Sequence, residues 1–281
     1  MNRKERMKIV FRFSEFSLLL FTLLIFTGDL SMSQITNQNN NKVENVVITV
    51  LYDNYQMKKG LETDWGFSCL IEVGKIKLLF DTGESGEILL RNMSKLEINP
   101  ENIDFVFLSH FHHDHTGGLS AFLKKNSNVT IYYPKSFPAD LVKDMKNSEA
   151  KPVPVSSFYE LQTNIYSLGE LNGIVPEQSL AIRTPKGIVV VTGCAHPGII
   201  NILEKAKELF PDETIYLALG GFHLYRKTED EIKSTINKML KMEILKSAPS
   251  HCSGNSARNL FKEAYHNNYI ETGTGKIIEI K

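Results

Sequence analysis

The chain has 281 residues, and its 32 lysine and arginine side chains balance 32 aspartate and glutamate side chains, so the formal net charge is zero. A chain of this length can form one α/β domain around one continuous core. The balanced charge gives no sign of the basic face that binds nucleic acid or acidic lipid. We therefore expect one catalytic domain whose partner is a small molecule, with no nucleic-acid partner.

The N-terminal segment, residues 1–33, differs in character from the rest of the chain. A basic start from Asn2 to Lys8 precedes an apolar run from Phe16 to Phe26, which is short of the ~20 residues that cross a bilayer. Ser31 and Ser33 are small residues of the kind found before a cleavage site. We predict a signal peptide and a mature protein that is periplasmic or secreted, without a stable membrane span. An uncleaved anchor is the alternative, and it would leave the domain in the same compartment.

Residues 34–44 are polar and rich in asparagine, so they lack the apolar side chains that a folded segment buries, and we expect a linker there. The catalytic domain is predicted to span residues 45–281. Its expected strands are short runs rich in β-branched and aromatic residues. In chain order they lie at Val46–Tyr52, at two runs within Phe67–Phe80 that turn at Gly74, and at Phe105–Leu108, Val129–Tyr133, Ile188–Val191 and Ile215–Leu219, with a shorter candidate at Met242–Leu245.

Helices are expected between these strands, where apolar residues recur at intervals of three and four. Residues 134–158, with four prolines and several lysines, are expected to be irregular and to form a loop over the site or a contact surface. Strands that alternate with helices indicate an α/β sandwich with the sheet inside and the helices outside. The expected helices are Ile88–Lys95, Leu119–Lys125, Ile199–Phe210, Glu229–Lys241 and Ala257–Tyr265.

One pattern recurs along the chain: an apolar strand runs directly into a residue type that binds metal. In open α/β sheets, ligands bind just beyond the carboxyl ends of the strands, so five strand ends of this kind point to one site. The residues at these ends are Asp81, His110, Cys194 with His196, His223 and His251.

The segment from His110 to His115 carries the strongest signal, because it holds four histidines and one aspartate. Residues two apart on an extended segment project to the same side, so His110 and His112 can share one metal ion. The chain must then bend, which lets Asp114 and His115 face a second ion about 3.5–4 Å away. Imidazole and carboxylate suit zinc, with iron or manganese as alternatives. A histidine-rich surface tract is disfavoured, since a buried strand and a Gly-Gly helix entry flank the segment.

The pattern His-x-His-x-Asp-His, preceded by Asp81 to Gly83, resembles the metallo-β-lactamase superfamily over residues 45–281. Motifs at residues 192–198, 220–224 and 249–254 are similar to the subfamily of dihydropterin-ribofuranosylaminobenzene-phosphate synthase. The resemblance implies an αββα sandwich, with two central mixed sheets and helices outside. It says little about the substrate, because one fold hosts many chemistries.

Carried over residue by residue, the resemblance implies two divalent metal ions with three histidine or aspartate ligands each. Asp81 would support the ligands from behind, because a buried carboxylate fixes the orientation of a metal-binding histidine. A plain strand-to-turn cap is the alternative for Asp81. The implied ligand sets are His110, His112 and His196 around one ion and Asp114, His115 and His251 around the other.

The chain departs from the wider superfamily at three places. Residues 174–178 contain no histidine where most members have Gly-His, and the strand that most members end in Gly-Asp ends here in Gly193-Cys194. The resemblance then implies that His196 replaces the missing histidine and that Cys194 takes the place of the bridging carboxylate. Trp65 stands where relatives lead us to expect a histidine.

The three cysteines form no Cys-x-x-Cys motif and fit neither a disulfide scaffold nor a zinc finger. We expect Cys194 at the mouth of the site as a metal ligand or an exposed nucleophile, with a pKa that neighbouring cations lower. A small buried hydrophobic residue at a strand end is the alternative.

Two further features are assigned to substrate chemistry. His223 and Asp114 are predicted to be catalytic residues. For His223, a structural role with hydrogen bonds is an equal alternative. Ser253 and Gly254 open the last helix, where free backbone N–H groups attract anions, and they are predicted to bind a phosphate or carboxylate.

The sequence thus predicts an exported metallohydrolase in which a metal-bound hydroxide attacks an ester or phosphoester-type small molecule. The helix entry at Ser253 and Gly254 favours an anionic substrate. Two alternatives stay open: a pterin-related synthase that uses the metal as a Lewis acid, and a non-catalytic metal-dependent sensor. A redox role for iron is disfavoured, because the chain carries no flavin or rubredoxin-like module. The substrate and the oligomeric state do not follow from the sequence.

Overall fold

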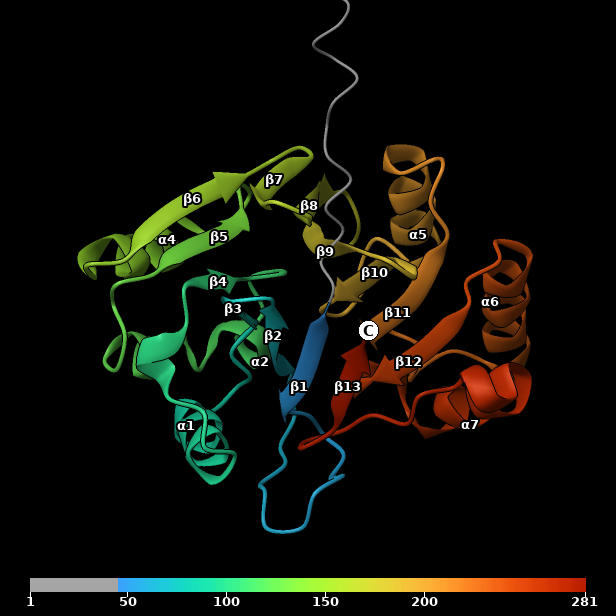
Figure 1. Cartoon of the computed structure of the whole chain (residues 1–281), viewed down its shortest axis with the longest axis horizontal. Helices are drawn as coiled ribbons and strands as arrows, with labels where there is room; N and C mark the ends of the chain where they lie inside the picture. Colours follow the sequence, from blue (N-terminus) through green and yellow to red (C-terminus); the bar gives the residue numbers. More distant parts are fainter. Residues whose placement is uncertain (1–44) are drawn as a thin grey trace, which may run out of the picture. The chain divides into compact units, whose positions relative to one another are not determined.

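The computed structural model describes residues 45–281 (Figure 1). The predicted signal peptide, residues 1–33, and the predicted linker, residues 34–44, lie outside the described residues. Within the described part, no helix has the length and apolar character needed to cross a membrane.

Two β-sheets form the centre of the part that the structure describes. The first has the strand order β13-β1-β2-β3-β4-β5-β6 and the second the order β12-β11-β10-β9-β8-β7. Each sheet combines antiparallel and parallel pairs, as predicted for a mixed sheet. The strands are β1 (Val46–Tyr52), β2 (Ser68–Val73), β3 (Ile76–Phe80), β4 (Phe105–Phe107), β5 (Thr130–Pro134), β6 (Lys151–Val155), β7 (Tyr159–Gln162), β8 (Ile165–Leu171), β9 (Glu177–Thr184), β10 (Gly187–Thr192), β11 (Ile215–Gly221), β12 (Lys246–Ser250) and β13 (Ile277–Ile280).

Helices cover the outer face of each sheet (Figure 1). Apolar residues of α1, α3 and α4 pack with the first sheet, and those of α5, α6 and α7 pack with the second. The result is the αββα sandwich that the sequence predicted. The helices are α1 (Gly86–Lys95), α2 (His113–Thr116), α3 (Leu119–Leu123), α4 (Ala139–Asn147), α5 (Ile199–Leu209), α6 (Glu229–Lys241) and α7 (Asn255–Tyr265), with 3-10 turns at Pro100–Asn102, His251–Ser253 and His266–Asn268.

Strand β10 shows how the layers are held together. Its side chains alternate, so that Val189 and Val191 enter the core between the sheets while Ile188 and Val190 face the helices. All four are fully buried. Burial of each such side chain contributes about 1.5–3 kcal/mol, which explains why a strand at this position is apolar on both faces.

Two expectations about the elements are wrong. Met242–Leu245 forms no strand, because α6 ends there and Glu243 turns the chain with a φ of 58°, so that β12 starts only at Lys246. Residues 134–158 are not irregular, since they contain α4 and β6. The prolines of β6 are tolerated because this strand lies at the edge of its sheet, where a missing N–H breaks no second ladder.

Candidate metal centre

The carboxyl ends of strands from both sheets meet at one place. Strands β3 and β4 are parallel neighbours in the first sheet, and β10, β11 and β12 are parallel neighbours in the second. Their ends therefore lie at common sheet edges, and the metal-binding residue types that follow them converge. The ligand atoms fall into groups whose members lie within 4.8 Å of one another: Asp114, His115, Cys194 and His251; His110, Cys194 and His196; Cys194, His223 and Cys252; and His110, His112 and Asp114.

The turns at these strand ends are sharp. Four residues other than glycine have a positive φ there: Asp81 at 51°, Ala195 at 57°, His223 at 53° and His251 at 43°. Such left-handed conformations are unfavourable for side chains with a Cβ and concentrate at functional sites, where the surrounding structure enforces them. These conformations lower the stability of the fold, and they bring the side chains at the strand ends together.

Three imidazoles form the first group of the centre. Nε2 of His110 lies 3.2 Å from Nδ1 of His112 and 3.3 Å from Nε2 of His196. Burial, reinforced by the neighbouring histidines, lowers the pKa of His110 well below its usual range and that of His196 to about 3. Neutral imidazoles with lone pairs that point at one place are the donor set that a divalent metal requires.

Asp114, His115 and His251 form the second group. Oδ2 of Asp114 lies 3.2 Å from Nε2 of His251 and 3.6 Å from Nε2 of His115. Burial lowers the pKa of His115, but the carboxylates of Asp81 and Asp114 outweigh it and raise this pKa to about 9. Because histidine binds a metal only when neutral, binding at this group releases a proton.

The ring nitrogens that face away from the centre fit a metal site. Nδ1 of His115 lies 2.7 Å from Oδ2 of Asp81, and a carboxylate only accepts, so Nδ1 keeps its proton and Nε2 is the atom that loses a proton to bind a metal. Ser109 donates its hydroxyl proton to Asp81 and therefore accepts from Nδ1 of His110 at 3.0 Å. Asn54 places its amide oxygen 3.0 Å from Nδ1 of His251. Partners of this kind are typical of metal-binding histidines.

Cys194 lies at the centre of both groups. Its sulfur is 3.1 Å from Nε2 of His115 and belongs to three of the four ligand groups found among the described residues. Only 3% of Cys194 is accessible, so the alternative of an exposed nucleophile is wrong, whereas that of a metal ligand stays a prediction. Burial, together with Cys252, raises the pKa of the metal-free thiol well above its usual value.

Glu177 fixes the backbone of the turn that carries Cys194 and His196. Its Oε1 accepts hydrogen bonds of 3.0 Å from the backbone N–H groups of Gly193, Cys194 and Ala195 and from the hydroxyl of Thr192, and its Oε2 accepts one of 2.9 Å from the N–H of His196. Five donors thus hold the turn between β10 and α5 on one fully buried carboxylate. Sequence reasoning missed this residue and noted its segment only for a missing histidine.

The residues assigned to substrate chemistry lie beside the ligands. The half-buried ring of His223 lies 4.6 Å from that of His196, centroid to centroid, and a hydrogen bond with the Cys252 side chain raises its pKa. Ser253 is buried, and its hydroxyl accepts a hydrogen bond of 3.0 Å from the N–H of Phe222. Gly254 directly precedes α7.

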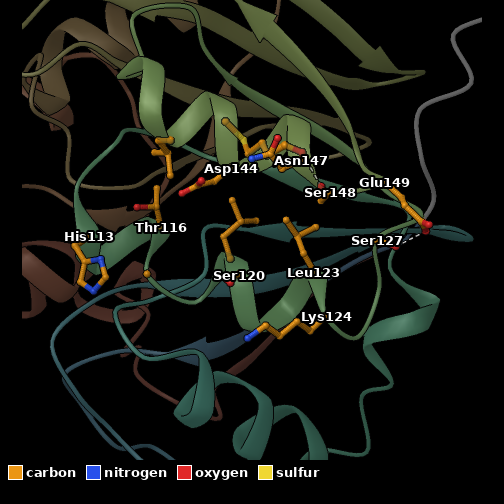
Figure 2. Close-up of a pocket in the computed structure, with 14 residues that line it drawn as sticks. His113, Thr116, Ser120, Leu123, Lys124, Ser127, Asp144, Asn147, Ser148 and Glu149 are labelled. Atoms are coloured by element: carbon orange, nitrogen blue, oxygen red, sulfur yellow. Dashed lines mark hydrogen bonds between the residues drawn. The ribbon is translucent and has the colours of Figure 1, made fainter.

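A separate pocket of about 680 Å³ is lined by residues of α2, α3 and α4 (Figure 2). His113 stands at one end of it, and Asp144 and Glu149 contribute to the opposite wall. None of the predicted metal ligands lines this pocket. Helix α4 therefore borders a cavity separate from the predicted ligands, and the role of residues 134–158 over the site or as a contact surface stays a prediction.

Comparison with known proteins agrees with this arrangement. The model of the Metallo-beta-lactamase superfamily matches residues 66–202. The chain is 31% identical to 7,8-dihydropterin-6-methyl-4-(beta-D-ribofuranosyl)-aminobenzene-5'-phosphate synthase from Methanocaldococcus jannaschii, over 86% of this chain and 99% of that protein. It is also 31% identical to ribonuclease Z of Pediococcus pentosaceus, but only over 49% of this chain and 46% of that protein.

A solved structure of a metal-dependent hydrolase of the beta-lactamase superfamily superimposes with a TM-score of 0.72. The two sequences are 28% identical, and the match covers 84% of this chain and 99% of that one. Since sequence, fold and the residues gathered at the strand ends all agree, the chain belongs to the metallo-β-lactamase superfamily.

Proposed function

We propose that the chain is a dinuclear metal-dependent hydrolase of ester or phosphoester bonds in a small anionic substrate. The observation that carries the proposal is the position of the Cys194 sulfur, which belongs both to the group of His110 and His196 and to the group of Asp114, His115 and His251. A ligand shared between two neighbouring donor sets fits two closely spaced ions. Zinc suits the mixture of imidazole, thiolate and carboxylate, with iron or manganese as alternatives.

Two divalent ions in these positions would supply an activated water and polarise the scissile bond. The chain itself orients the reaction. The partly buried carboxylate of Asp114, which lies beside His115 and His251, is the proposed acceptor for the proton of the attacking water. His223, whose ring lies against that of His196, is the proposed donor to the leaving group. Ser253 and Gly254, at the start of α7, are proposed to bind the anionic part of the substrate.

The relatives support hydrolysis in part. The solved structure with 28% identity is described as a metal-dependent hydrolase, and ribonuclease Z matches about half of the chain. A second candidate is a synthase-type condensation, because the synthase from Methanocaldococcus jannaschii is 31% identical over 86% of the chain. Both reactions would use the same proposed metal ligands, so the substrate decides between them.

The test is an assay of zinc-loaded protein against phosphoesters, lactones and β-lactams, with a pterin condensation assay in parallel. We expect hydrolysis of a phosphoester, and its loss in Asp114→Asn and His251→Ala. His113→Ala is the matched control, because His113 belongs to the same segment but is exposed and lines the other pocket. Product formation in the condensation assay alone would favour the synthase, and equal activity of His251→Ala and wild type would refute the proposed site.

A further inference from the structure

Two large aromatic side chains stand exposed beside the metal centre. Trp65 and Tyr225 are each 43% accessible, and their ring centroids lie 5.9 Å apart at an angle of 70°. The Trp65 ring lies 4.9 Å from that of His251, and the Tyr225 ring lies 5.6 Å from that of His223. Trp65 and Tyr225 therefore form an exposed aromatic pair that contacts His251 and His223 of the proposed active site.

The backbone fixes Trp65 to the metal ligands. The N–H of Gly66 donates to Oδ1 of Asn54 at 3.2 Å, and the same oxygen accepts from Nδ1 of His251. Gly66 has a φ of 140°, and a Cβ there would lie 2.5 Å from the carbonyl oxygen of Asp114. Only glycine permits this close approach, so the loop that carries Trp65 is seated on the segment that carries Asp114.

Tyr225 is fixed in a similar way to the other side of the centre. Its backbone N–H donates to the carbonyl of Cys252 at 3.2 Å. The α-carbon of Gly254 packs so closely on Tyr225 that a Cβ at this glycine would lie 2.8 Å from the tyrosine Cα. Both rings are thus held by the loops that carry His251 and its neighbours, and they are not loose surface residues.

We propose that Trp65 and Tyr225 bind a planar aromatic group of the substrate next to the bond that is hydrolysed, an inference that rests on the proposed function. Aromatic rings attract one another in offset-stacked and edge-to-face arrangements, and two rings set at a steep angle offer a planar ligand a face and an edge. Rigid exposed aromatic side chains lose little entropy when a ligand covers them, which favours such a role.

Trp65 is the only tryptophan of the 281 residues, so its fluorescence reports on this place alone. The experiment titrates the zinc-loaded full-length protein with phenyl phosphate and with cyclohexyl phosphate, which carry the same charge and differ in aromaticity. We expect phenyl phosphate to change the tryptophan fluorescence and to bind about two- to tenfold more tightly. Tyr225→Leu should abolish this preference, whereas Tyr225→Phe should keep it.

Tyr159→Leu is the matched control, because Tyr159 is a 45% exposed tyrosine on β7, outside every ligand group. Trp65→Leu gives a second test that does not depend on Tyr225. In this variant the preference is measured as the ratio of KM for the two phosphates or by their competition for binding. Equal affinity for both phosphates, or a preference that survives in both leucine variants, would overturn the inference. A phenyl preference in binding without turnover of either phosphate would support it while refuting the hydrolase.

Discussion

The sulfur of Cys194 lies 3.1 Å from Nε2 of His115, so a thiol at the end of β10 in one sheet meets an imidazole that follows β4 in the other. Because the same sulfur also belongs to the group of His110 and His196, Cys194 lies between the two proposed ligand sets. The proposed dinuclear centre depends on this sulfur as the ligand that the two ions share.

Replacement of Cys194 by serine should weaken metal binding at least tenfold, because a hydroxyl is a poor substitute for a thiolate ligand. The measurement is metal retention against a chelator, together with the thiolate-to-metal absorption band of the cobalt-loaded protein. Cys69→Ala is the control, since Cys69 is buried in the core between the sheets. A cobalt band that persists in Cys194→Ser and disappears in Cys69→Ala would show that the wrong thiol was assigned.

Glu177→Gln should reduce metal affinity or activity by about 10–100-fold, because one oxygen becomes an NH2 group facing backbone donors that position Cys194 and His196. Stability should also fall by about 1–3 kcal/mol, as buried N–H groups lose their acceptor. Denaturant unfolding and the cobalt band separate the two effects. Glu160→Gln, at an exposed position on β7, should change neither. A folded Glu177→Gln protein with an unaltered band would contradict the positioning role.

The site could be predicted in outline because its ligands follow strands directly and because His110 to His115 form a local pattern. Glu177 could not be found in this way, since its role depends on backbone N–H groups 16 to 19 residues further along the chain. Cys194 packs against His115, 79 residues away in the sequence, so its burial was missed for the same reason. Trp65 was noted only as a departure, because its neighbour His251 lies far away in sequence.

The fold was predictable where strands are uniformly apolar, as in β1 and β10. It was not predictable over residues 159–184. There the strands β7, β8 and β9 contain polar residues among the apolar ones and pair in antiparallel fashion. In β9 the polar residues Glu177 and Gln178 are buried by specific partners, which periodicity alone does not reveal. Contacts between residues far apart in the sequence thus stabilise these strands, and the local sequence pattern does not predict them.

Inorganic phosphate should inhibit the enzyme competitively if the start of α7 binds an anion. Ser256→Asp places a negative charge at this exposed first turn and should raise the inhibition constant about two- to fivefold. Asn259→Asp, exposed and one turn further along, is the control and should have a smaller effect. An inhibition constant that Ser256→Asp leaves unchanged would locate the phosphate on the metals alone.

Export is the prediction for residues 1–33, motivated by their basic start and apolar run. Expression of the full chain in a bacterium, followed by fractionation and N-terminal analysis, should give an extracytoplasmic protein that begins near Gln34. A variant without residues 2–33 should stay in the cytosol. Recovery of the full-length chain from the cytosol, with residues 1–33 still attached, would contradict export.

The most direct test of the account is the metal content of the purified protein after loading with zinc and removal of free metal. We predict two ions per chain for the wild type, with His110→Ala emptying mainly one position and Asp114→Ala mainly the other, because these residues belong to different ligand sets. One ion per chain in the wild type, or the same loss from both positions in each variant, would contradict a dinuclear centre shared through Cys194.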